Sequence, residues 1–274
     1  MRRVMSMVAL SACLTFGVNL NASEGASTTQ QVKQQSGNVI NLAGKQRMLT
    51  QKMSKEALFV AKGIDVDNNK ANLDKTVALF DKTLKGLISG DTQLGLPKTE
   101  NPEILAQLTV VKELWVPFKS SIEKGNLKAI SEQNIPLLKN MNKAVQMYAK
   151  ASGSKLDPAM AQTINLAGRQ RMLTQKMTKE LLLAANGIDA EANKANAKKT
   201  FNLFKTTLSD LIEKAPNAEI KAQLNIVKGL MEEYQPIIEN GDTSNEALKK
   251  AEGLNMKLLK ESNKAVQMYT ASIK

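Results

Sequence analysis

The sequence contains no histidine, and Cys13 is its only cysteine. Without histidine there can be no imidazole acid–base catalysis, no histidine-based triad and almost no transition-metal site. One cysteine cannot form a disulfide framework within the chain. A glycine-rich phosphate loop of the Walker type is also missing. We therefore predict a protein that is not an enzyme and that uses no metal and no cofactor.

Aromatic residues are scarce, with one Trp and three Tyr, so the chain has no platform on which single-stranded nucleic acid could stack. The net charge of +12 favours anionic partners in general, among them acidic membranes, nucleic acid and small oxyanions. Lysines are spread through the sequence and are not gathered on one helix face, which disfavours a membrane-surface helix. No nucleic-acid partner is expected.

Long apolar runs are also few, and the clearest one lies at the start of the chain. Two arginines precede an apolar run over residues 4–18, and Ala22 follows, which is the layout of a secretory signal peptide. We predict a signal peptide over residues 1–22, cleaved after Ala22, and a soluble periplasmic protein. A competing interpretation is a lipoprotein signal, because residues 10–13 resemble a lipobox that ends in Cys13. No other segment approaches the ~20 apolar residues of a transmembrane helix.

The chain contains one 17-residue stretch twice, as residues 40–56 and 164–180. The two copies differ only at Lys45, which is Arg169 in the second copy, and at Ser54, which is Thr178. The flanking sequences have diverged much further. Core helices accept many apolar substitutions of similar volume, so packing alone rarely demands such identity. The pattern favours a constraint beyond packing on this stretch.

On a helix, the stretch has two distinct faces. One face is apolar and should pack in a core: Leu42, Leu49, Met53, Ala57 and Val60. The other face consists mostly of small residues around one Arg and one Gln: Ile40, Ala43, Gly44, Arg47, Gln51, Ser54 and Leu58. The second copy repeats this face: Ile164, Ala167, Gly168, Arg171, Gln175, Thr178 and Leu182. Small residues allow another helix to approach closely. An arginine in the middle of such a face needs an anion, or else it extends along its stem to solvent.

Helical periodicity predicts four helices in each repeat, joined by short turns, and no strand pattern is present. We predict an all-α fold of two tandem antiparallel four-helix bundles, over residues 31–151 and 159–274. Residues 23–30 are expected to form a flexible lead-in and residues 152–158 a linker. Each bundle ends in the same run, Asn-Lys-Ala-Val-Gln-Met-Tyr, which begins at Asn142 and again at Asn263.

The run Asn-Leu-Ala-Gly-Arg-Gln-Arg-Met-Leu-Thr-Gln-Lys-Met at residues 165–177 resembles the signature of the PilJ-type periplasmic sensor domain. This is the N-terminal domain of type IV pili methyl-accepting chemotaxis transducers. The same run is similar to the P-box of the nitrate and nitrite sensor kinases NarX and NarQ. The resemblance is strongest over the first helix of each repeat, and the four-helix layout extends it over nearly the whole mature chain.

The resemblance implies a bundle that pairs with a second copy through its first helix, with one anion on the pair axis. The motif arginine of each copy would hold that anion, and the matching positions are Arg47 and Arg171. Gly44 and Gly168 lie one turn away on the same face. Ala43, Gln51, Ala167 and Gln175 would support this face. Whether the two motif helices pair within one chain or between the chains of a homodimer is left open by the sequence.

These observations favour an exported sensor module that binds a small anion, with nitrate or nitrite as the first candidates. The relatives continue into a transmembrane helix and a signalling region that this sequence does not contain, so we expect a membrane chemoreceptor or sensor kinase as partner. The alternative is a non-enzymatic helical interaction protein of a chemoreceptor or type IV pilus system with no small ligand. On that hypothesis Arg47 and Arg171 pair with acidic groups or with water.

Overall fold

A computed structural model describes residues 20–273, which form eight α-helices and one short 3-10 turn. The helices are α1 (Leu20–Lys62), α2 (Val66–Ser89), α3 (Pro102–Glu123), α4 (Leu127–Ala151), α5 (Pro158–Ala185), α6 (Ala190–Glu213), α7 (Ala218–Asn240) and α8 (Asn245–Ala271). Over the same residues the only β pairing is an isolated bridge between Asp91 and Leu96. The predicted signal peptide and Cys13 lie outside the described part, except for residues 20–22.

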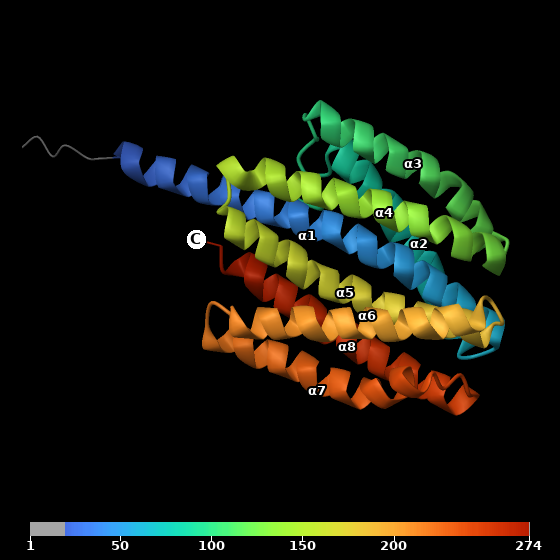
Figure 1. Ribbon diagram of the computed structural model, residues 1–274. Coiled ribbons are helices and arrows are strands. Elements are labelled where there is room, and N and C mark those ends of the chain that lie inside the picture. Colours follow the sequence, from blue (N-terminus) through green and yellow to red (C-terminus); the bar gives the residue numbers. More distant parts are fainter. Residues whose placement is uncertain (1–19, 274) are drawn as a thin grey trace, which may run out of the picture.

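The helices form two four-helix bundles, α1–α4 and α5–α8, as the sequence predicted. Figure 1 shows α1 and α5 side by side in the centre, with the rest of each bundle on opposite sides of this pair. The contact between α1 and α5 is the most extensive between any two helices of the described chain. The two copies of the repeated stretch therefore meet within one chain.

Turns and caps at the same positions of each repeat set the ends of the helices. Gly63 and Gly187 have φ of 74° and 76°, so both first helices end on a glycine in the left-handed region. Asp65 and Asp189 follow with φ of 42° and 41°, which gives both repeats the same turn. The helices α3, α4, α5, α7 and α8 each begin with a side-chain cap, and the capping residues in this order are Asn101, Asn126, Asp157, Asn217 and Ser244.

Residues 23–30 belong to α1, so the prediction of a flexible lead-in is wrong. The last residue of this segment contacts the other end of the described chain, because the Gln30 Nε2 donates to the Ile273 carbonyl oxygen at 2.7 Å. A helix that is already formed extends at little cost per residue, even through weak helix formers such as Gly25 and Thr28. The helices also continue through Pro117, Pro136 and Pro236, and Figure 1 shows α3 curving and not dividing.

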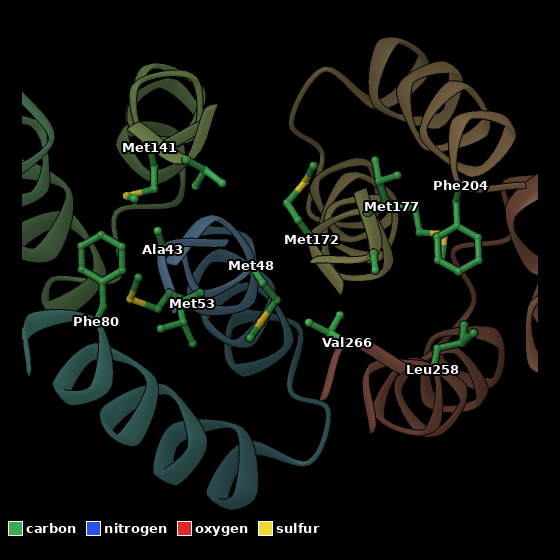
Figure 2. Packing of buried hydrophobic residues seen from close by; sticks show 14 of the residues in the cluster. Ala43, Met48, Met53, Phe80, Met141, Met172, Met177, Phe204, Leu258 and Val266 are labelled. Carbon is green, nitrogen blue, oxygen red and sulfur yellow. The ribbon is translucent and has the colours of Figure 1, made fainter. Parts of the chain in front are cut away.

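Each bundle has its own apolar core. Figure 2 shows Met53, Phe80 and Met141 in the first bundle, and Met177, Phe204 and Leu258 in the second. Of the predicted core face of α1, Leu49, Met53 and Ala57 are buried, while Leu42 and Val60 are half-buried. Within residues 20–273 no helix has the length and apolarity needed to cross a bilayer.

Candidate functional site

The small-residue face of the repeated stretch lies buried between the bundles. All seven of its residues on α1 and all seven on α5 are buried. Arg47 and Arg171 are each 1% exposed, which places them among the most completely buried large side chains of the described chain. The interpretation that these arginines extend along their stems to solvent is therefore wrong.

Each arginine donates a hydrogen bond across the pair of motif helices. The Nη2 of Arg47 donates to the carbonyl oxygen of Asn165 on α5 at 3.0 Å. The Nη2 of Arg171 donates to the carbonyl oxygen of Asn41 on α1 at 3.1 Å. The arrangement has approximate two-fold symmetry, which follows from the duplication. Both guanidinium groups are therefore held at the contact between α1 and α5.

A second hydrogen bond joins each arginine to the last helix of its own bundle. The Nη1 of Arg47 donates to the Asn142 Oδ1 at 2.7 Å, and the Nη1 of Arg171 donates to the Asn263 Oδ1 at 2.9 Å. The sequence analysis did not assign these asparagines to the site. The run that is identical in both bundles could have identified them, because each asparagine is the first residue of that run.

Gly44 and Gly168 lie directly beneath the two guanidinium groups. A Cβ on Gly44 would stand 3.4 Å from the Arg47 Nη2 and 3.7 Å from the Arg171 Nη2. A Cβ on Gly168 would stand 3.3 Å and 3.7 Å from the Nη2 atoms of Arg171 and Arg47. Both Nη2 atoms are therefore close to both glycines, and a side chain larger than a methyl group would displace them. The structure brings together the four residues that the sequence singled out.

The site has an uncompensated positive charge. Burial, together with the nearby charges of Arg171 and Arg169, lowers the pKa of Arg47 to about 9. Burial lowers the pKa of Arg171 to about 10. Both values exceed neutral pH, so both groups are cationic there. Neither arginine forms an ion pair within residues 20–273, and the Nε of each is buried without a hydrogen-bond partner among them.

Gln51 and Gln175, one turn along the same face, form a second polar layer instead of contacting the arginines. The Gln51 Nε2 donates to the Asn134 Oδ1 and the Gln175 Nε2 donates to the Asn255 Oδ1, each at 2.9 Å. Ala43 and Ala167 are buried beside the glycines and add no polar group. The sequence analysis did not identify Asn134 or Asn255, although both repeats have an asparagine at this position, in register with Asn142 and Asn263.

Two buried lysines join this second layer across the bundles. The Lys55 Nζ of α1 donates to the Asn255 Oδ1 of α8 at 3.0 Å, and the Lys179 Nζ of α5 donates to the Asn134 Oδ1 of α4 at 2.9 Å. Burial lowers the pKa of each lysine to about 8. The sequence analysis did not single out these lysines. Each bundle therefore supplies a lysine that donates a hydrogen bond to an asparagine of the other bundle.

Comparison with known proteins identifies the same family in both repeats of the chain. The family PilJ, described as "Type IV pili methyl-accepting chemotaxis transducer N-term", matches residues 28–144 and 158–254. The methyl-accepting chemotaxis protein McpN of Pseudomonas aeruginosa is 29% identical over 152 residues, which are 53% of this chain and 28% of McpN. The chain therefore spans little more than a quarter of that relative's length.

A solved structure, the ligand-binding domain of the P. aeruginosa nitrate receptor McpN, is 28% identical, with a TM-score of 0.38. That match covers 42% of this chain and 96% of the McpN domain. The two segments of the family match begin in α1 and α5 and extend into α4 and α8. The chain belongs to the PilJ family, the N-terminal domains of type IV pili methyl-accepting chemotaxis transducers, and it matches that family in both of its bundles.

Proposed function

We propose that this protein is an exported sensor module that binds one small anion between Arg47 and Arg171. The observation that carries the proposal is the pair of buried guanidinium groups at the α1–α5 contact, with no carboxylate paired to either among the described residues. Two buried like charges repel each other and lack the solvation that water would provide. An anion between them would offset both costs.

The donor chemistry supports a planar oxyanion. A guanidinium group offers a rigid, planar fork of N–H donors that matches oxygen atoms held in one plane. The Nε of each arginine is buried without a partner, and both Nη2 atoms lie near the two glycines. Nitrate and nitrite are the first candidates, because the P. aeruginosa relative with the similar domain is described as a nitrate receptor.

Anion binding would act on the relative position of α1 and α5. Without the anion, the arginines repel each other across the helix contact. With it, both are attracted to one negative charge, so the two states differ in the preferred approach of the helices. We propose that a membrane chemoreceptor or sensor kinase detects this difference, and that the protein acts in the periplasm.

The hypothesis of an interaction protein without a small ligand is less well supported. It expected acidic groups or water as the partners of Arg47 and Arg171. The partners are neutral amide and carbonyl oxygens from Asn142, Asn165, Asn263 and Asn41. These oxygens orient the guanidinium groups but leave their charge uncompensated.

Calorimetric titration of the mature protein with nitrate, nitrite, chloride, sulfate and acetate tests the proposal. We expect one anion per chain, because one chain holds both arginines, and a preference for the planar oxyanions. An Arg47→Ala, Arg171→Ala double variant serves as the negative control. Absence of saturable heat with every anion would overturn the proposed function and favour the interaction protein. Two anions per chain would contradict a single shared site.

A further inference from the structure

Two surface grooves related by the duplication lie beside the motif helices. The α8 groove lies between α1, α2 and α8 and has a volume of about 640 Å³. The α4 groove lies between α4, α5 and α6 and has a volume of about 390 Å³. Equivalent residues line both: Lys52 and Lys75 in the α8 groove correspond to Lys176 and Lys199 in the α4 groove. Each groove is thus built from a motif helix and the last helix of the other bundle.

The α4 groove is strongly basic. Lys139, Arg169, Lys176 and Lys199 line it, and no carboxylate of the described chain is among its lining residues, although Lys176 forms an ion pair with the buried Glu180 behind it. Lys139 and Lys199 are exposed. A cleft lined by charges of one sign raises the local concentration of small ions of the opposite sign. This groove therefore attracts anions.

The α8 groove is basic where it is nearest to the arginines. Lys45, Lys52, Lys75 and Lys260 line it together with the buried Lys55, and the carboxylates of Glu56, Asp65 and Glu252 also contribute. Burial lowers the pKa of Lys45, and the charge of Arg171 lowers it further, so this lysine is within electrostatic reach of the buried pair. Five cations against three carboxylates leave this groove positive as well.

Each groove borders a buried arginine through one asparagine. Asn142 lines the α4 groove, and its Oδ1 accepts the hydrogen bond from the Arg47 Nη1 at 2.7 Å. Asn263 lines the α8 groove, and its Oδ1 accepts from the Arg171 Nη1 at 2.9 Å. Both asparagines are half-buried, so each has one side toward the groove and the other toward a guanidinium group.

We propose that the two basic grooves are the routes by which the anion reaches Arg47 and Arg171, and that Asn142 and Asn263 are positioning residues that close these routes. This inference rests on the proposed function. Rotation of one asparagine side chain breaks one hydrogen bond and exposes the guanidinium group behind it. Each of the two arginine residues is otherwise 1% exposed. The proposal also explains why the repeated run begins with asparagine in both bundles, because each route needs the same residue to close it.

The first arm of the test removes groove charge. The groove variant carries four substitutions of exposed groove lysines: Lys75→Gln, Lys139→Gln, Lys199→Gln and Lys260→Gln. The control variant carries four substitutions of exposed lysines that line neither groove: Lys112→Gln, Lys128→Gln, Lys221→Gln and Lys249→Gln. Both variants lose the same net charge. Relaxation-dispersion NMR of the Gly44 and Gly168 amides across a nitrate titration measures the association and dissociation rates.

We expect the groove variant to bind nitrate about three- to tenfold more slowly than the control at low ionic strength, because electrostatic steering raises on-rates by tenfold or more. The difference should shrink at high ionic strength, where salt screens the exposed charges. Equal association rates in the two variants, with nitrate still bound, would overturn the entry routes and leave the proposed function intact. No saturable binding to the unmodified protein would overturn both.

The second arm changes the closing residues in opposite directions. Asn142→Ala with Asn263→Ala should raise the association and dissociation rates together, so that the Kd changes by less than the rates. Asn142→Asp with Asn263→Asp should slow association, because an aspartate would hold the arginine by a charge-assisted bond. A higher dissociation rate with unchanged association in the alanine variant would show that the asparagines only support the bound anion. The aspartate pair, which keeps the side-chain shape, guards against a folding defect of the alanine pair.

Discussion

At the residue scale, the site depends on two arginines that are costly to bury. Each keeps its charge in an interior that offers only amide and carbonyl oxygens. A buried charge of this kind lowers stability unless an opposite charge compensates it. Retention of both arginines in an otherwise small-residue face is therefore better explained by a ligand than by packing.

If one anion bridges the arginines, Arg47→Ala alone should remove most of the affinity, and Arg171→Ala should do the same. A charge-assisted contact is worth ~1.5–3 kcal/mol, so each single variant should weaken binding by about ten- to a hundredfold. The double variant should add little, because groups that act as a unit are not additive. Calorimetry on the three variants measures this. Single variants that instead halve the stoichiometry and keep the affinity would show two independent sites.

Substitution of Gly44 by alanine should change the stability of the protein and its affinity for the anion in opposite directions. Gly44→Ala should raise the stability of the anion-free protein by about 0.5–1 kcal/mol, because glycine is unfavourable inside a helix and the added Cβ meets nothing closer than 3.4 Å. The same methyl group lies against both Nη2 atoms and should weaken nitrate binding. Gly229→Ala, where an added Cβ meets nothing within 4 Å, is the matched control and should raise stability alone. Thermal denaturation with and without nitrate distinguishes the two; unchanged affinity in Gly44→Ala would place the anion elsewhere.

At the element scale, the two bundles are joined by a layer of polar contacts, between α1 and α8 and between α5 and α4, as well as by the small residues between α1 and α5. Lys55 and Lys179 each cross to an asparagine of the other bundle, and that asparagine also binds the neighbouring glutamine. Both lysines are 4% exposed. The layer holds the bundles in register next to the arginines, so a shift between α1 and α5 must disturb it.

The two lysines make stability depend on pH. Their pKa falls from 10.5 to about 8 on folding, so above pH 8 the unfolded chain binds more protons than the folded one. The free energy of unfolding should therefore rise between about pH 8 and 10, by up to about 1.4 kcal/mol per pH unit for each neutral lysine. Burial lowers the pKa of both lysines more than the nearby carboxylates raise it. These are Glu56 and Glu252 for Lys55 and Glu180 for Lys179, while the like charges of Lys52 and Lys176 act in the same direction as burial.

Urea denaturation at several pH values measures this dependence. Lys179→Met should reduce the slope, while Lys112→Met, on the exposed face of α3, should leave it unchanged. A stability that falls from pH 8 to 9 in the unmodified protein would contradict neutral lysines in the fold.

At the scale of the whole molecule, one chain contains both halves of the arginine pair. The two bundles face each other through equivalent helices, so the molecule has the arrangement of a symmetric dimer without a second subunit. The two halves are not identical: the α8 groove contains carboxylates that the α4 groove lacks. A chain with two copies can therefore vary its two anion routes independently, which a homodimer cannot do.

Export is the prediction that concerns the whole chain. The mature protein should begin at Ser23, because the charged start, the apolar run and Ala22 form a secretory signal. Mass spectrometry of the exported protein measures the new terminus. A diacylated Cys13 would show that the lipoprotein interpretation is right.

The sequence by itself determined the helices, their number per bundle and the face that carries the arginines. These features are local, since apolar periodicity, the glycines that end α1 and α5 and the repeated stretch are all properties of neighbouring residues. The duplication also made the arginines, glycines and small residues stand out against a diverged background. The error at residues 23–30 arose because weak helix formers there extend a helix that is already formed by packing further along the chain.

Only the tertiary structure decided that α1 and α5 pair within one chain, and which residues surround the arginines. Asn142 contacts Arg47 across 95 positions, and Lys55 contacts Asn255 across 200. Such contacts depend on how whole helices dock, and an asparagine on a helix face has the same local pattern whether it meets a guanidinium group or water. The sequence left open whether the arginines reach solvent or are buried, because their burial arises only when the two bundles close over them.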